Sequence, residues 1–315
     1  MKRFRNILFF ASREKVESAP LKRAMALAEN NLAKLTLVDV VEKISGPLRM
    51  LLDPKAYADL RRARIEQRLK ELERAVAPWG KDRFRFGIKV LEGKPFIEII
   101  RLVQSQKIDL VVKIAQGSGE PSETLFGSTD LNLLRKCPCP VWIFKPDRQP
   151  RFSKIMAAID PDPNKTEKSA LAMKILELAT SLARTEKSEL HVVHTWTLEG
   201  ESSLRSGRFG MPEDEVDGLA AEVRQTHHQW LSEMLKEIST EDLRLHTHLV
   251  KGEAGKAIPW LVGEKGIKLI VMGTVGRTGL PGFFIGNTAE TGWNQVHCSV
   301  LAVKPDGFVS PVRPE

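Results

Sequence analysis

The sequence predicts a tandem α/β protein, in which two similar domains each form an open parallel β-sheet with helices on both faces. The first observation behind this prediction is an internal repeat with an offset of 159 residues, most simply explained by duplication of one domain. The repeated pairs are Gly93 and Gly252, Gly117 and Gly276, Gly127 and Gly286, Thr129 and Thr288, and Cys139 and Cys298. The second observation is that strand and helix patterns alternate within each half, which is typical of parallel sheets.

The second half shows this alternation most clearly. Short apolar runs predict strands, and apolar residues at helical spacing predict the helices between them. The expected strands are 154–159, 189–196, 243–250, 267–273 and 299–304, and the expected helices are 169–183, 216–238, 254–265 and a short one from 287. The first half has the same pattern.

The boundary between the repeats is expected in the segment KPDRQP (145–150), which contains two prolines. At the start of each half, FRNILFFAS (4–12) aligns with FSKIMAAID (152–160). We therefore expect one domain over residues 1–147, a second over 151–307 and a tail over 308–315.

Composition narrows the class of protein. The chain has 315 residues, 42% hydrophobic content and a net charge of +8. No apolar run is long enough for a transmembrane helix, and Arg13 and Glu14 follow the first apolar run too soon for a signal peptide. Three cysteines give no disulfide framework, which fits a reducing cytoplasm. The first half is the more basic one, but no groove-reading motif accompanies the charge, so nucleic-acid binding is not expected.

Each half resembles a universal stress protein domain, and the tandem resembles the two-domain, E-type members of that family. The resemblance spans almost the whole chain, and its most specific parts are GTVGRTG…GNTAE after residue 272 and LLRKCPCPVW (133–142). It implies five-stranded sheets of order 3-2-1-4-5. It also implies a bacterial, cytoplasmic, stress-induced protein without established enzymatic activity, with roles that include resistance to DNA-damaging conditions.

The resemblance further implies a nucleotide site marked by G-2x-G-9x-G-(S/T). The second half has this glycine spacing, but asparagine occupies the position of the hydroxyl residue. Glycine allows close approach of backbone to phosphate, and free N–H groups at a helix start favour an anion. A strand-order reversal also places the ends of strands 154–159 and 267–273 at one crevice. The candidate nucleotide residues are Asp160, Gly273, Gly276, Arg277, Gly286, Asn287 and Thr288. Plain strand-to-helix turn chemistry explains the same loop without a ligand.

The first half has a degenerate form of the motif. Ile114 replaces the first glycine, and Ser12 replaces the aspartate. The surviving positions are Gly117, Gly127 and Ser128. Because acidic residues in the loop would repel phosphate, we expect no nucleotide there, and we interpret Ser128 as a helix N-cap.

Three functions follow from these features. The first is a non-enzymatic stress-response protein that binds a small ligand or partner proteins, with any ATP or AMP in the second half. The second is a nucleotide-binding switch or weak ATPase. The third is a carrier or sensor of an acyl compound, because the loops and the connector ISGPLRMLLD (44–53) offer apolar side chains. Packing in the core and between the halves is the favoured explanation of these apolar residues.

No metal site is expected from the sequence. His246 and His248 alternate on a predicted strand and so share one face, but the sequence reveals no third ligand.

The last strands of the two halves, 141–144 and 300–303, are apolar and need cover as edge strands. In single-domain relatives such strands pair across a twofold axis, so the resemblance implies a pseudo-dimer within one chain. A homodimer of the whole chain is a further expectation.

Overall fold

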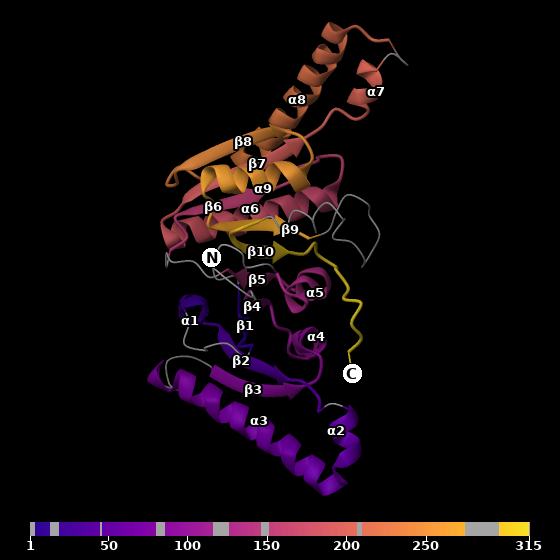
Figure 1. Ribbon diagram of the computed structural model, residues 1–315. Coiled ribbons are helices and arrows are strands. Elements are labelled where there is room, and N and C mark those ends of the chain that lie inside the picture. The colour runs from indigo at the N-terminus through magenta and orange to yellow at the C-terminus, as the bar shows by residue number, and fades with distance from the viewer. Residues whose placement is uncertain are drawn as a thin grey trace. The chain divides into compact units, whose positions relative to one another are not determined.

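The computed structural model describes residues 4–12, 19–44, 46–79, 86–115, 126–145, 151–206, 210–274 and 296–314 (Figure 1). The chain divides into two compact units. The first is built mainly from residues up to Pro150 together with Phe308–Glu315, and the second begins at Arg151. The C-terminal segment belongs to the first unit, in which Gln104 Nε2 donates a hydrogen bond to the Val312 carbonyl at 3.1 Å.

The first unit alternates strands and helices. Its strands are β1 (Asn6–Phe10), β2 (Lys34–Val41), β3 (Phe86–Glu92), β4 (Leu110–Ile114) and β5 (Val141–Phe144). Its helices are α1 (Ala19–Asn31), α2 (Gly46–Leu51), α3 (Pro54–Val76), the 3-10 turn η1 (Ala77–Trp79), α4 (Pro95–Gln106) and α5 (Ser128–Lys136). The strand order is β3-β2-β1-β4-β5, and every described pairing within it is parallel.

The second unit repeats this topology. Its strands are β6 (Lys154–Ala158), β7 (Glu189–Trp196), β8 (Leu245–Lys251), β9 (Leu269–Gly273) and β10 (Ser299–Val303). Its helices are α6 (Thr166–Glu186), α7 (Glu201–Arg205), α8 (Glu213–Lys236) and α9 (Ala254–Lys265). The order β8-β7-β6-β9-β10 is again 3-2-1-4-5, so the predicted fold class is confirmed. The helix expected from residue 287 lies outside the described residues.

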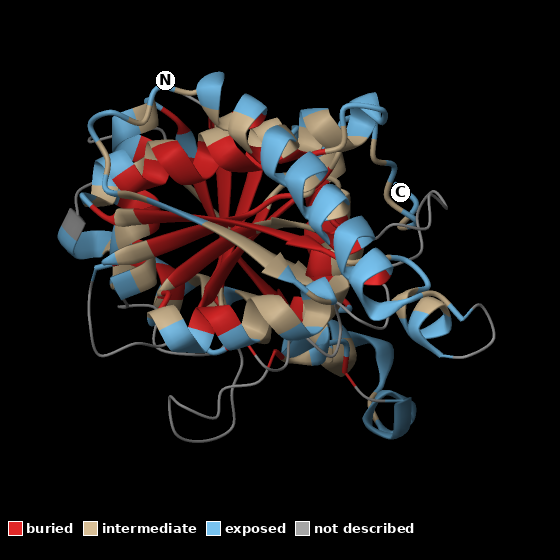
Figure 2. Ribbon diagram, turned by 90° about the horizontal axis from the view of Figure 1, so that it is seen from above, coloured by how far each residue is buried: buried red, intermediate tan, exposed pale blue. Residues whose placement is uncertain are grey.

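The core of each unit lies between the sheet and its helices. Strands β1, β2 and β4 are buried along almost their whole length, because parallel strands with helices on both faces have no solvent-facing side. Figure 2 shows the central strands in red, the outer strands β3 and β8 largely in tan, and many helices with red inner and pale blue outer faces. No helix among those described is both long and apolar enough to cross a bilayer.

Helix α5 corrects one expectation. Ser128 is its first residue rather than its N-cap, and the N-cap position belongs to Gly127. A glycine has no side chain to cap with, so the carboxylate of Asp130 accepts the Gly127 backbone N–H at 2.9 Å instead. Asp130 has no surface exposure and forms an ion pair with the equally buried Lys113 of β4.

Candidate functional site

The predicted crevice of the second unit lies where strand order reverses, between β6 and β9. Ala158 of β6 is level with Met272 of β9, so the residues that follow these strands emerge side by side. Asp160 follows β6, and Thr274 follows β9. In open parallel sheets, ligands bind at such a point, beyond the carboxyl ends of the strands.

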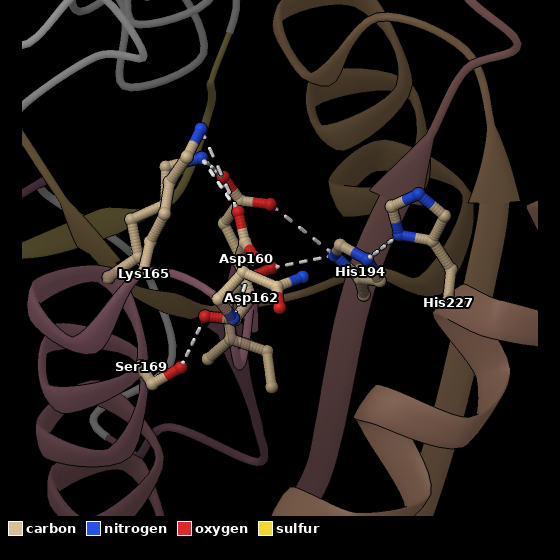
Figure 3. Close-up of polar contacts among 9 residues, drawn as sticks. Asp160, Asp162, Lys165, Ser169, His194 and His227 are labelled. Carbon is tan, nitrogen blue, oxygen red and sulfur yellow. Dashed lines mark hydrogen bonds and ion pairs between the residues drawn. The ribbon is translucent and has the colours of Figure 1, made fainter.

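Asp160 presents a partly exposed carboxylate at this edge (Figure 3). Its Oδ2 accepts a hydrogen bond from Lys168 Nζ at 3.1 Å, and its Oδ1 is 3.9 Å from His194 Nδ1. Asp162 lies beside it, and its Oδ2 is 3.8 Å from Lys165 Nζ and 3.9 Å from Lys168 Nζ. Two acids and two bases therefore form a nearly neutral, polar rim at the start of α6.

The Asp162 backbone fixes the start of α6 to this rim. Its carbonyl accepts the Ser169 hydroxyl at 2.8 Å and the Lys165 backbone N–H at 2.9 Å. Lys165 is the N-cap residue of α6 and makes no side-chain capping bond. The start of α6 therefore holds the amino groups of Lys165 and Lys168 near the end of β6.

His194 is a buried residue near the end of β7 and connects the strands to α8. Its Nδ1 is 3.2 Å from the Ile159 carbonyl, and its Nε2 is 2.7 Å from His227 Nδ1. Because a carbonyl only accepts, His194 Nδ1 carries the proton, and its Nε2 accepts from His227. Both nitrogens of His194 are thus engaged and its side chain is 1% exposed, so it positions α8 and does not serve as a base.

The first unit builds the same connection with different chemistry. Ala11, Asp39 and Arg68 occupy the repeat positions of Ile159, His194 and His227. Arg68 of α3 forms an ion pair with the buried Asp39 and donates from Nη2 to the Ala11 carbonyl at 3.0 Å. A second carboxylate, Glu71, lies 2.7 Å from Arg68 Nη1. The sequence of neither half marks Arg68 or His227 as a contact between helix and strand. The two residues are nevertheless 159 positions apart, which is the offset of the repeat.

Gly273 is the last residue of β9, and Thr274 follows it. A Cβ added at Gly273 would lie 3.0 Å from Leu171 Cδ2, so close packing of α6 favours glycine here whatever the loop binds. The Thr274 hydroxyl is buried, and among the described residues it has no hydrogen-bond partner. A buried hydroxyl without a partner is costly, and within the described part of the chain this group is available to a ligand at the end of β9.

The structure brings together Asp160, Gly273 and Thr274, as strand order predicts. Gly276, Arg277, Gly286, Asn287 and Thr288 lie outside the described residues, as does Gly117 of the first unit. Ser12 is buried and lies two residues after the end of β1. In the second unit, Asp160 occupies the corresponding position after β6. The first-unit crevice therefore has a small hydroxyl and the Asp39–Arg68 pair in place of a partly exposed carboxylate.

A second cluster of titratable groups lies on strands β7 and β8. His191 is buried, and its ring stacks on His246 and His248 with centroids at 4.7 Å and 5.2 Å. Burial, followed by repulsion from His246, His248 and Lys154, lowers the His191 pKa from 6.5 to about 4, although Glu189 opposes this shift. The imidazole is thus neutral in the folded protein at pH 7.

This shift predicts a loss of stability in acid. Between pH 6.5 and 4 the unfolded chain takes up a proton at His191 and the folded protein does not, so stability falls as pH falls. The loss levels off below pH 4 at about 3 kcal/mol. Urea unfolding with EDTA at several pH values measures it, with His191→Thr as the comparison because Thr36 occupies this position in the first unit. Equal pH slopes for both proteins would contradict the prediction.

The two cysteines that flank Pro138 do not form a reactive pair. Cys137 and Cys139 are both buried and free, with their Sγ atoms 3.6 Å apart. Burial and the neighbouring Cys137 raise the pKa of Cys139 well above its ordinary value. A protonated, buried thiol is a poor nucleophile, so the pair has a packing role.

These features place the chain among two-domain α/β proteins whose parallel sheets each contain a strand-order reversal. A sequence model of the universal stress protein family matches residues 3–145 and again 151–304. The chain therefore belongs to the universal stress protein family, and its predicted tandem form is confirmed.

Full-length relatives share this tandem form. Universal stress protein E of Salmonella typhi is 28% identical over 315 residues, which cover 99% of this chain and 98% of that protein. Its counterpart in Escherichia coli K12 is 27% identical with the same coverage. A universal stress protein structure from Pseudomonas aeruginosa UCBPP-PA14 aligns with a TM-score of 0.69 and 25% identity, over 98% of this chain and 95% of its own. A functionally unknown protein from Pseudomonas aeruginosa PAO1 has a TM-score of 0.70 and 24% identity.

Proposed function

We propose that this protein is a non-enzymatic, cytoplasmic stress-response protein that binds a small polar ligand, of the adenine nucleotide class, in the second-unit crevice. The observation that carries the proposal is the partly exposed Asp160 carboxylate beside the unused Thr274 hydroxyl at the β6/β9 reversal. A carboxylate in this place can accept hydrogen bonds from ribose hydroxyls. Lys165 and Lys168 supply positive charge nearby, and the glycine-spaced loop from Gly273 supplies backbone N–H groups for phosphate.

The first unit lacks this combination. Ser12 stands where Asp160 stands in the second unit, and the nearby Asp39 carboxylate is already paired with Arg68. We therefore assign nucleotide binding to the second unit alone. His194, the imidazole at this strand end, has both ring nitrogens engaged, which favours binding over hydrolysis and leaves a weak ATPase as the lesser alternative.

The test compares single substitutions by calorimetry with ATP and AMP. Asp160→Ala is expected to weaken binding roughly 10- to 100-fold, because hydrogen bonds to a charged group contribute about 1.5–3 kcal/mol. Gly276→Val should abolish binding by blocking close approach of phosphate. Asp306→Ala is the matched control, since this carboxylate is 86% exposed and pairs with Lys174 near the middle of α6. Unchanged affinity in both Asp160→Ala and Gly276→Val would remove the assignment.

An apolar ligand is the second candidate, and helix α2 of the first unit favours it. Met50 is 89% exposed and Leu51 82% exposed, and no residue of α2 is buried. The corresponding helix α7 of the second unit is polar and is held by ion pairs from Glu201 to Arg205 and Lys251. Exposed apolar residues on a connector after a strand are typical of a binding surface.

Mass spectrometry of extracts from gently purified protein distinguishes the two ligands. A nucleotide at about one per chain supports the crevice proposal. An acyl compound that is lost in Met50→Ser/Leu51→Ser supports a carrier instead. A control variant, Leu32→Ser, changes an equally exposed leucine at the end of α1 and should retain either ligand.

The proposal also includes the assembly of the tandem. Strands β5 and β10 are each the last strand of their unit in chain order, and each is entirely apolar except for Ser299. Because apolar edge strands need cover, we expect them to pair within one chain as a pseudo-dimer. Crosslinking mass spectrometry of the monomeric fraction tests this pairing, and crosslinks found only in a dimeric fraction would assign it to two chains.

A further inference from the structure

The strand pair β7 and β8 gathers four potential metal ligands on one face of the sheet. His191 pairs with His246 across the two strands, and Val193 pairs with His248. Because side chains alternate along strands, Glu189, His191, His246 and His248 all point to the same face. His194 has the opposite parity on β7, so the cluster is separate from the crevice proposed for the ligand.

Three of these residues direct their ligand atoms at one point. His191 Nε2 lies 3.7 Å from Glu189 Oε2, and His246 Nε2 lies 3.9 Å from the same oxygen. Ligand atoms of the three residues all lie within 4.8 Å of one another. Around a tetrahedral ion with bonds of about 2.0–2.1 Å, ligand atoms are roughly 3.3 Å apart. The two distances to Glu189 Oε2 would have to shorten by about half an ångström to reach that spacing, and the distance between the two imidazoles by at most about 1.5 Å. The side chains of Glu189 and His246 are 30% and 49% exposed and can move by this much.

The fourth residue fixes the orientation of the buried imidazole. His248 Nε2 is 3.0 Å from His191 Nδ1, so a proton on His191 Nδ1 completes this hydrogen bond and leaves His191 Nε2 as a bare lone pair. Among the described residues, His191 Nε2 has no hydrogen-bond partner, although its side chain is only 4% exposed. A metal-binding histidine ordinarily has its second nitrogen held in this way by a neighbouring group.

The charges around the cluster are mixed. Lys154 Nζ is 3.8 Å from Glu189 Oε2, and Arg244 Nη1 is 3.9 Å from Oε1. Both cations would oppose a metal ion, but the Arg244 side chain is 84% exposed and can move into solvent. Lys154 is 37% exposed at the start of β6 and can do the same. Displacement of these two contacts frees the whole Glu189 carboxylate.

The repeat shows that the cluster is not a by-product of the fold. The first-unit residues at the positions of Glu189, His191, His246 and His248 are Lys34, Thr36, Gly87 and Lys89. This first-unit set lies on the equivalent strands β2 and β3, and it has two positive charges and no imidazole. The pairing of these strands therefore does not require the four ligand groups of the second unit.

We propose that Glu189, His191 and His246 bind one divalent transition-metal ion of the zinc class, with His248 as the residue that positions His191. Nitrogen and carboxylate oxygen suit zinc, and three protein ligands leave a fourth position for water or an exchangeable group. The ion would tie β8 to β7 at the outer edge of the second-unit sheet. It would also make the stability of this edge dependent on metal supply, since a ligand that binds only the folded state stabilises it.

The test uses the full-length chain without a histidine tag, dialysed against chelator and titrated with Zn²⁺ by calorimetry. One ion per chain is expected, and Glu189→Gln and His246→Ala should each abolish this binding. His248→Gln should weaken it by about 10- to 100-fold, the usual effect of losing such a supporting contact. His228→Ala is the matched control, because His228 is an exposed histidine of α8 and should leave binding unchanged. Retention of the ion in His246→Ala, or no binding to the wild-type chain, would overturn the proposal.

A second measurement does not depend on the folding of any variant. Histidine carbethoxylation of the wild-type chain, mapped by mass spectrometry, should show Zn²⁺-dependent protection of His246 but not of His228. The visible spectrum of the Co²⁺-loaded chain should show the intense bands of a four- or five-coordinate ion. Equal modification of both histidines with and without Zn²⁺ would place any bound metal elsewhere.

Discussion

Asp130→Asn is expected to destabilise the first unit by about 3–5 kcal/mol, because it leaves a buried ammonium group without its counter-charge. Lys113 and Asp130 both have no surface exposure, and Lys113 Nζ lies 2.6 Å from Asp130 Oδ1. Lys113 also donates to the Ile114 carbonyl at 2.7 Å, and Asp130 accepts the Gly127 N–H. One substitution therefore disturbs the end of β4 and the start of α5 together.

The repeat provides a compensated control for this pair. Met272 and Ala289 occupy the corresponding positions of the second half in the sequence. The double variant Lys113→Met/Asp130→Ala should therefore recover most of the lost stability, since removal of both charges leaves none unpaired. Denaturant-dependent hydrogen exchange, followed by mass spectrometry on peptides of β1 and β4, reports on the first unit separately. This account would be contradicted if Asp130→Asn were within about 1 kcal/mol of the wild-type stability. It would also be contradicted if the double variant were less stable than Asp130→Asn.

The architecture could be predicted from the sequence because its signals are local and occur twice. The expected strand 154–159 and helix 254–265 agree closely with β6 and α9. The expected helix 169–183 is shorter than α6, which begins at Thr166 and ends at Glu186. Its polar first turn has no apolar periodicity, so only the contacts of Asp162 with Lys165 and Ser169 reveal where the helix starts.

The candidate sites were less accessible to prediction, because they depend on pairs of residues that are distant in the chain. The position of Asp160 beside the loop after β9 follows from strand order, which the sequence could suggest. The contacts of His194 with His227, and of His191 with Glu189 and His246, depend on strand register and on the packing of α8. Alternation alone placed His246 and His248 on one face, but it could not show that His191 of the neighbouring strand completes the set.

Arg68→Met is expected to cost about 3–5 kcal/mol in the first unit, because Asp39 remains buried without its partner. The Asp39 side chain is 2% exposed, and its Oδ1 accepts a hydrogen bond from the Val40 backbone N–H at 2.7 Å. The same change removes the bond from Arg68 to the Ala11 carbonyl and so loosens α3 from β1. Amide hydrogen exchange in the part of α3 that follows residue 60 should accelerate more than amide hydrogen exchange in α1.

The transplant Asp39→His/Arg68→His tests whether the position requires charge or only a polar connection. The second unit holds the equivalent helix with two imidazoles, one of which contacts the strand-end carbonyl. At pH 7.5 the double variant should therefore lose less than half of the unfolding free energy that Arg68→Met loses in the first unit. At pH 5 its advantage should disappear, because two protonated rings are both donors and cannot share a hydrogen bond. If the double variant were as unstable as Arg68→Met at pH 7.5, the two connections would not be interchangeable, and the ion pair would be specific to the first unit.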